Sequence, residues 1–284
     1  MRTIPCFISL IVLFELGCGE VGEPAPVDIA STTSARTSAP VPMPQATDSV
    51  SPPSPTVHDL PAGVVLHLSF DLSTACKKEN RIYIKDLSGR GNDAALRKVT
   101  PAKGKFGTAI DFHGDSGSKV TGSDQSLPSG QSPMTISLWF NARKHDLQHL
   151  FMYGTAERGL ARGIAVVRPP GMTFFHWGGR ALHLDSVYYS LNRWHHFVAT
   201  YENGKAAIYL DGELKGEGPF SANTMLLQYI IGKAYSEGGH FDGMIDEVIV
   251  FDRALPPAEI KVLYERPEYM EQGELAYTAA NPCE

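Results

Sequence analysis

Two adjacent histidines, His195 and His196, have the side chains that most readily suggest catalysis or metal binding. They lie in the stretch 192–212, NRWHHFVATYENGKAAIYLDG, where residues alternate with the two-residue period of a β-strand. Because neighbouring side chains on a strand point to opposite faces, the two rings cannot bind one ion together. We therefore expect structural roles, with one ring beside Trp194 and the other facing water or a cross-strand partner.

Sugar recognition is a second possible chemistry, and it needs exposed aromatic rings with polar neighbours. Trp177 lies beside a Gly-Gly turn and Arg180, in the segment HWGGRALHLD at 176–185. The candidate ligand-binding residues are His176, Trp177, Arg180, Tyr188 and Tyr235. The alternative is that most of these side chains fill the core or the edges of the fold.

The sequence lacks the common motifs of enzymes. It contains no Gly-x-Ser-x-Gly elbow, no His-Glu-x-x-His helix and no phosphate-binding glycine loop. Lys plus Arg is 25 and Asp plus Glu is 31, so the net charge is −6. The basic residues are scattered, and we expect no nucleic-acid partner.

The N-terminus has the pattern of an export signal. Arg2 precedes a short apolar run, 4–16, which is too short to span a bilayer. Leu16, Gly17 and Cys18 resemble the end of a bacterial lipoprotein signal, in which the cysteine receives a lipid. Glu15 departs from that pattern, and the alternative is an ordinary secretory signal. We expect a protein that is lipid-anchored in the cell envelope or secreted, and that meets a membrane only through an N-terminal lipid.

Composition divides the rest of the chain. Residues 19–61 form a Pro/Ser/Thr-rich linker, which cannot bury enough apolar surface to fold. The folded domain is predicted at 62–266, between the signal at 1–18 with its linker and a polar C-terminal tail at 267–284. Export favours a disulfide between Cys76 and Cys283. The alternative is two unpaired thiols.

The folded part is predicted to be an all-β, two-sheet antiparallel jelly-roll sandwich with one short C-terminal helix. Short extended segments follow one another with almost no helical periodicity. The helix is predicted at 255–264, with proline in its first turn. The clearest predicted strands are 64–70, 108–112, 134–141, 147–153, 163–167, 172–177, 194–201, 205–210, 226–231 and 244–251.

Several motifs in order carry a family resemblance. They are LSFD at 68–71, KDLSGRGNDA at 85–94, GKFGTAIDFHG at 104–114, MTISLWFNA at 134–142, the 192–212 stretch and FDGMIDEVIVFDRAL at 241–255. Together they resemble the LamG-like (laminin-G-like) jelly-roll domains of the concanavalin A-like lectin/glucanase superfamily. The resemblance covers about 63–266. The core it implies includes Phe112, Ile136, Leu138, Phe197, Ile208, Ile245 and Val248.

The resemblance also bears on cofactors, because many superfamily members bind calcium at a rim. It implies Asp86, Asn92 and Asp246 as calcium ligands, which are oxygen donors of the kind a hard cation prefers. The alternative is that Asp86 and Asn92 make turn hydrogen bonds and Asp246 accepts from a neighbouring strand.

The superfamily includes glucanases, whose catalytic carboxyl groups lie about 5 Å apart in retaining enzymes. The nearest stretch here, 244–248, lacks their first glutamate. Asp246 and Glu247 are neighbours on a predicted strand, so we expect them to face opposite ways and not to form that pair. The expected function is therefore that of an envelope-tethered or secreted binding or adhesion module for a carbohydrate or glycoprotein. The alternatives are a divergent polysaccharide-active enzyme and a purely structural surface domain.

Overall fold

The predicted strands at 194–201 and 205–210 are present and belong to two consecutive hairpins. Two-residue turns join three consecutive strands, β13 (His195–Glu202), β14 (Lys205–Leu210) and β15 (Glu213–Pro219). The turn residues Asn203, Gly204, Asp211 and Gly212 all have positive φ, between 49° and 78°. This is the backbone of a type I′ turn, which asparagine, aspartate and glycine tolerate best.

The computed structural model describes residues 60–168, 170–179, 181–236, 238–266, 277 and 281–283. The predicted signal at 1–18 with Cys18, nearly all of the linker, Arg180 and most of the tail lie outside these ranges. The predicted boundaries of the signal, the linker, the folded domain and the tail stay predictions.

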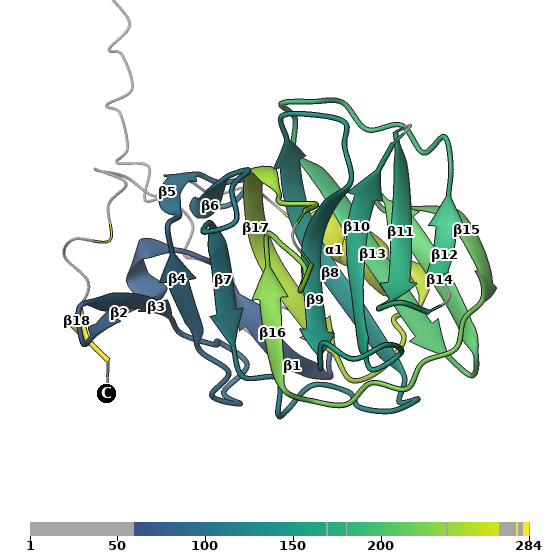
Figure 1. Ribbon diagram of the computed structural model, residues 1–284, viewed down its shortest axis with the longest axis horizontal. Coiled ribbons are helices and arrows are strands. Elements are labelled where there is room, and N and C mark those ends of the chain that lie inside the picture. The colour runs from purple at the N-terminus through teal and green to yellow at the C-terminus, as the bar shows by residue number, and fades with distance from the viewer. Residues whose placement is uncertain are drawn as a thin grey trace, which may run out of the picture. The chain divides into compact units, whose positions relative to one another are not determined.

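The described strands form two sheets that pack face to face (Figure 1). In the eight-stranded sheet the order is β15-β14-β13-β8-β17-β6-β5, and β1 pairs with β17. Its other members are β1 (Val64–Leu68), β5 (Thr100–Lys103), β6 (Thr108–His113), β8 (Met134–Ala142) and β17 (Asp242–Phe251).

The ten-stranded sheet has the order β12-β11-β10-β9-β16-β7-β4-β3-β2-β18. Its pairs are antiparallel except for β18 with β2. The strands are β2 (Ala75–Lys78), β3 (Arg81–Ile84), β4 (Ala94–Arg97), β7 (Lys119–Gly122), β9 (Gln148–Gly154), β10 (Ala161–Val167), β11 (Gly171–His176), β12 (Ala181–Leu184), β16 (Gln228–Ile231) and β18 (Asn281–Pro282).

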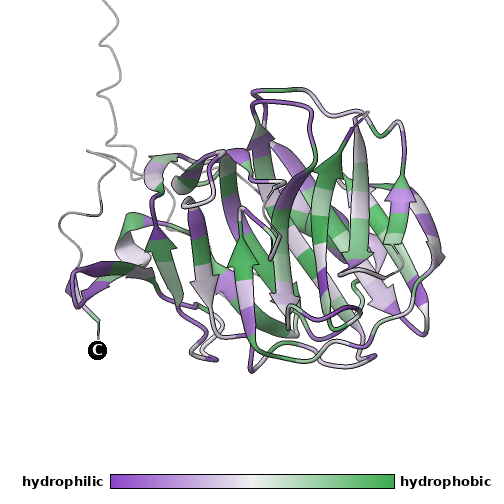
Figure 2. Ribbon diagram, in the orientation of Figure 1, coloured by the Kyte–Doolittle hydropathy of each residue, from purple (hydrophilic) through white to green (hydrophobic). Residues whose placement is uncertain are grey.

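The core lies between the two sheets. The seven core residues named from the sequence are all fully buried in one cluster. Figure 2 shows hydrophobic residues along the central strands and hydrophilic ones mainly in loops and in the outlying hairpin of β2 and β3. The all-β sandwich predicted from the sequence is thus confirmed.

One helix packs on the outer face of the eight-stranded sheet. α1 (Pro257–Tyr264) has proline at its start and buries Ile260 and Leu263 against Val198 and Ile249. The predicted helix is confirmed, although it begins two residues later than expected. A short 3₁₀ helix, Leu72–Thr74, follows β1. In the part of the chain that is described, no helix has the length and apolar character to cross a membrane.

The predicted disulfide between Cys76 and Cys283 is present. The two Cα atoms lie 4.9 Å apart, although 207 positions separate the cysteines in the sequence. The bond fixes the short parallel pairing of β18 with β2. It closes nearly the whole sandwich into one covalent loop.

Candidate functional site

An open groove lies where the edges of the two sheets meet, and glycine makes the meeting possible. β12 is an edge strand of the ten-stranded sheet and β15 of the eight-stranded sheet. A Cβ atom at Gly216 would lie 2.7 Å from Cδ2 of Leu184, and one at Gly218 would lie 3.2 Å from Cδ1 of Leu182. A side chain at Gly216 would therefore require the Leu184 side chain to move.

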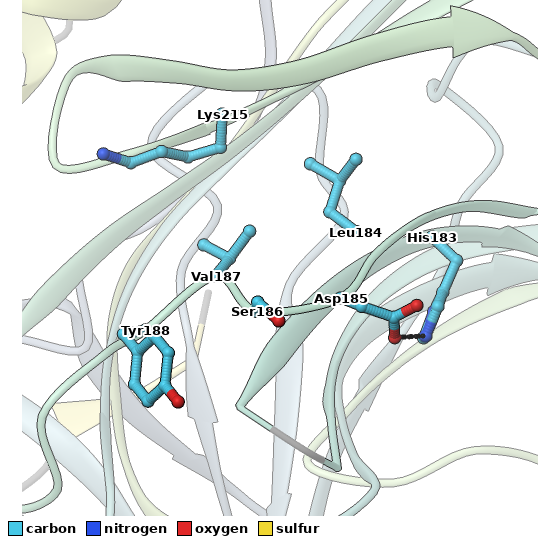
Figure 3. Close-up of a pocket in the computed structure, with 7 residues that line it drawn as sticks. All are labelled: His183, Leu184, Asp185, Ser186, Val187, Tyr188 and Lys215. Atoms are coloured by element: carbon cyan, nitrogen blue, oxygen red, sulfur yellow. Dashed lines mark ion pairs between the residues drawn. The ribbon is translucent and has the colours of Figure 1, made fainter.

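The groove has a volume of about 560 Å³ and an amphipathic lining. In Figure 3, Leu184 and Val187 lie in the middle, between Tyr188 and a pair of polar side chains. The full lining is His183, Leu184, Asp185, Ser186, Val187, Tyr188 and Lys215. A volume of this size suits a small ligand or a short oligomer.

The polar pair consists of His183 and Asp185. His183 lies on β12 and Asp185 lies in the turn directly after this strand, with Nε2 of His183 3.0 Å from Oδ1 of Asp185. Both are solvent-accessible, with 42% and 69% of their side chains exposed. Across the groove, Nζ of Lys215 lies 2.7 Å from Oε2 of Glu213. The rim thus offers hydrogen-bond donors and acceptors to a ligand.

Tyr188 is the most exposed large hydrophobic residue of the domain, at 76%. Its chain neighbours Val187 and Tyr189 are buried, at 9% and 3%, and both belong to the core cluster. The tyrosine is therefore held outward by two anchored neighbours. Ser186 just before them has a φ of 63°, which reverses the chain after β12.

Trp177 and Tyr235 lie together on the outer face of the ten-stranded sheet. Their ring centroids are 5.9 Å apart in an edge-to-face arrangement, and His149 lies 6.5 Å from Trp177. The Tyr235 hydroxyl donates to the carbonyl of Gly154. These rings are only partly exposed and pack on a small cluster that includes Met152.

His176 does not belong with Trp177, because strand alternation turns it inward. Its ring is 7% exposed, lies 6.1 Å from Phe220 and accepts a hydrogen bond from the Asn223 N–H at 3.3 Å. Burial lowers its pKa. Of the predicted ligand-binding residues, only Trp177 and Tyr235 come together, Tyr188 lines the groove, and Arg180 lies outside the described residues.

The sequence reasoning missed His183, Asp185 and Lys215. His183 and Asp185 are only two positions apart and just before Tyr188, but Asp185 lies in the turn after β12, so strand alternation could not have identified the pair. Lys215 reaches the groove from the other sheet, through the contact that Gly216 permits.

His195 and His196 face opposite ways, as predicted. Nδ1 of His195 lies 2.8 Å from Oδ2 of Asp211. His196 stacks on Trp139, not on Trp194, at a centroid distance of 5.0 Å, and its Nε2 lies 2.8 Å from Oγ of Ser137. Burial lowers the pKa of His196 to about 3, so the ring is neutral and structural.

The prediction that Asp246 and Glu247 face opposite ways is wrong. The pairing of β17 with β8 is irregular between Asp246 and Ile249, and Glu247 has a φ of 50°. This bulge lets Val248 enter the core in place of Glu247. Both carboxyl groups therefore lie on the outer face, where Asp246 accepts from the Phe106 N–H at 2.9 Å.

The pKa values of the two carboxyl groups shift in opposite directions because their partners differ. Glu247 lies 2.9 Å from both His67 and Arg266. Burial alone would raise its pKa, but these positive partners lower it. Burial, followed by the nearby Glu247 charge, raises the pKa of Asp246. Asp246 is fully buried and Glu247 is 2% exposed, so in this structure neither is within reach of a polysaccharide.

Of the predicted calcium ligands, Asp86 and Asn92 hydrogen-bond to each other in one loop, whereas Asp246 accepts from Phe106. Asp86 accepts from the N–H groups of His67, Ser88 and Asn92 at 3.0–3.1 Å, as in the alternative of turn hydrogen bonds. The Asn92 side chain also donates to Asp86, at 3.3 Å. Within the described ranges, no group of three or more His, Cys, Asp or Glu residues could hold a metal ion. Calcium binding stays a prediction.

Comparison with solved structures finds the same fold in binding domains. Domain 4 of AbnA, a GH43 extracellular arabinanase from Geobacillus stearothermophilus solved in complex with arabinotriose, is 19% identical, with a TM-score of 0.56 over 72% of this chain and 98% of that domain. The binding domain of Paraclostridial Mosquitocidal Protein 1 is 16% identical, with a TM-score of 0.55 over 71% of this chain. The binding domain of botulinum neurotoxin serotype G is 15% identical, with the same score and coverage.

The match spans only about half of the two toxin domains, 52% and 50%. At these identities the likeness concerns the fold. No curated protein sequence matches the chain. Residues 113–261 match the family model described as concanavalin A-like lectin/glucanases superfamily. The chain therefore belongs to the concanavalin A-like lectin/glucanase superfamily.

Proposed function

We propose that the protein is a non-catalytic binding module that recognises carbohydrate, free or on a glycoprotein, in the groove beside Tyr188. The observation that carries the proposal is an aromatic ring, 76% exposed and held by buried neighbours, over a groove with an apolar floor. A sugar ring has an apolar face of C–H groups that stacks on an aromatic side chain, and hydroxyls that need polar partners.

The remaining parts of the site supply those polar partners. Asp185 is 69% exposed, and a carboxylate accepts several hydrogen bonds, so it has capacity beyond its contact with His183. Lys215 and Ser186 can donate to sugar oxygens. The arabinotriose complex of the arabinanase domain supports the proposal, since a domain of this fold was solved with an oligosaccharide.

A glycan array with the full chain tests this function, followed by titration of the bound sugars. We expect Tyr188→Ala to weaken binding about tenfold or more, as is usual for an aromatic residue central to an interface, and Tyr188→Phe to retain most of it. Val262→Ala is the matched control, since Val262 is an exposed apolar residue, at 53%, on α1. No binding to any glycan, or equal binding by Tyr188→Ala, would overturn the proposal.

Export and tethering form the second part of the proposal. Its support is the signal-like N-terminus together with the Cys76–Cys283 bond, because structural disulfides persist mainly in oxidising compartments. We expect mass spectrometry of the protein from its native membrane fraction to find a diacylglyceryl group on Cys18, and Cys18→Ser to release the protein. An intact N-terminus in the cytosolic fraction would contradict export.

Calcium at the loop of Asp86 and Asn92 is a third, separate part of the proposal. The support is the density of oxygen donors in this loop. A ligand that binds only the folded state raises the melting temperature. We expect millimolar calcium to raise it and a chelator to reverse the change. An unchanged melting temperature would remove calcium from the proposal.

A further inference from the structure

The charges of the groove are arranged in pairs. Apart from Tyr188, the ionisable residues that line it are His183, Asp185 and Lys215. His183 lies 3.0 Å from Asp185, and Lys215 lies 2.7 Å from Glu213, which stands just outside the lining. The His183 imidazole and the Lys215 ammonium therefore each already have a carboxylate partner within hydrogen-bond distance. Figure 3 shows His183, Asp185 and Lys215 around the apolar side chains of Leu184 and Val187.

This pairing opposes an anionic ligand. A ligand carboxylate or sulfate would have to displace Asp185 or Glu213 from its cation, or lie beside a carboxylate that stays there. Two like charges about 4 Å apart cost about 1 kcal/mol in water and more near a protein surface. The net charge of the chain, −6, adds a weaker repulsion at long range.

The same pairing suits an uncharged polyhydroxylated ligand. Sugar hydroxyls both donate and accept, and each charge pair presents an acceptor carboxylate next to a donor nitrogen. Asp185 and Glu213 are 69% and 77% exposed, so each can accept from a hydroxyl without leaving its cation. The apolar groups of the groove do not distinguish ligands by charge. These groups are the side chains of Leu184 and Val187 and the ring of Tyr188.

We infer that the groove selects neutral carbohydrate and discriminates against acidic polysaccharides. The inference rests on the proposed function, because it concerns the ligand of the same groove. It also predicts how binding depends on salt. Screening weakens interactions between net charges, so the affinity for a neutral sugar should change little between low and high salt.

The experiment compares gluco- and manno-hexaoses with the same sugars after oxidation of their primary hydroxyls to carboxylates. Dissociation constants of the full chain are measured at low and at physiological salt. We expect the neutral sugars to bind at least about tenfold more tightly at low salt, and the difference to narrow as salt rises.

The double variant Asp185→Asn/Glu213→Gln leaves Lys215 without its carboxylate and the groove with a net positive charge. We expect the ratio of acidic to neutral affinity to rise about tenfold at low salt. The matched control is Glu217→Gln, which removes one negative charge on the same strand, at a residue paired with Lys205 outside the lining. In the control this ratio should change less than about twofold.

The outcomes separate the two proposals. If an oxidised sugar binds as tightly as its neutral counterpart, or more tightly, and Tyr188→Ala abolishes that binding, the groove is a sugar site and the inference of neutral selectivity fails. If neither these sugars nor any glycan of the array binds, or if Tyr188→Ala leaves binding unchanged, the proposed function itself fails. An unaltered ratio in the double variant would also overturn the role of charge pairing.

Discussion

The outer face of the eight-stranded sheet and the groove contain the same chemical pair in opposite surroundings. His67 and Glu247 lie 2.9 Å apart, with 1% and 2% of their side chains exposed. His183 and Asp185 lie 3.0 Å apart, with 42% and 69% exposed. The distances are nearly equal, so distance alone does not tell which pair supports the fold and which can meet a ligand. Exposure to water makes that distinction.

A third pair, His195 and Asp211, is intermediate, at 2.8 Å with 13% and 31% exposed. Asp211 also accepts from the backbone N–H of His196, so it joins a turn to a strand. The three pairs form a series from buried to exposed. Water can solvate the partner left behind more fully at each step, so the cost of removing one carboxylate should fall along the series.

Glu247→Gln should give the largest effect. It leaves Arg266, whose side chain is 8% exposed, without its carboxylate partner. Breaking a buried ion pair costs about 3–5 kcal/mol, so we expect a loss of that order in the free energy of unfolding by urea denaturation. Asp185→Asn is the matched control at the exposed pair and should cost less than about 0.5 kcal/mol. Equal losses in the two variants would contradict the comparison.

The second-largest effect should be the pH dependence of stability that the buried His196 causes. The pKa of His196 falls from 6.5 to about 3 on folding, because the ring is buried. Between these values the unfolded chain binds a proton that the folded protein does not. The stability that depends on the neutral His196 ring is fully present above pH 6.5. It is lost as the pH falls toward 3, by up to about 1.4 kcal/mol per pH unit.

Urea denaturation between pH 7 and pH 4 measures this slope. Asp246 acts in the opposite direction, since its raised pKa favours the folded state as the pH falls below that pKa. The test therefore compares the slopes of proteins that all retain Asp246, so that its contribution is the same in each. We expect His196→Gln to have a shallower slope than the wild type. Ser137→Ala, which removes only the hydrogen bond to the ring, should lower stability and keep the slope. Equal slopes for wild type and His196→Gln would refute the assignment.

At the intermediate pair the expected loss of stability lies between those of the buried and the exposed pair. Asp211→Asn keeps an oxygen for the His196 N–H, and asparagine tolerates the φ of 54° found there. It removes only the negative charge next to His195, so we expect a loss of about 1 kcal/mol. Thermal and urea denaturation measure it. A loss as large as that of Glu247→Gln would show that exposure does not order the series.

The fold was predictable where local chemistry decides it. Asn203-Gly204 and Asp211-Gly212 take the positive φ that these residue types favour, and every predicted strand is present with each end within two residues of its predicted place. The strands β2, β3, β4, β5, β7 and β12 were not predicted, because segments of four residues show too little alternation. Their places come from pairing with distant strands.

The site was less predictable, for two physical reasons. The bulge at Asp246 depends on a positive φ at Glu247, and nothing in the type of that residue favours such a conformation. The groove depends on a contact between edge strands of different sheets. Gly216 leaves room for this contact, but a glycine in the sequence does not predict it. Tyr188 was identified because a tyrosine is a plausible sugar platform in any setting. Its polar neighbours His183, Asp185 and Lys215 could be recognised as part of a site only once the fold had brought them together.

The Cys76–Cys283 bond has a mechanical consequence. If the protein is tethered by its N-terminus and holds a ligand in the groove, tension enters the domain near Leu60 and pulls first on β1. Pulling can peel β1 away from β17, but simple unravelling in one direction stops at Cys76. From there the force divides between the two arms of the covalent loop, one through β2 and the other through Cys283. The shorter arm limits the distance between the groove and the anchor. A bound ligand would therefore stay within this distance of the anchor even after the sheets begin to separate.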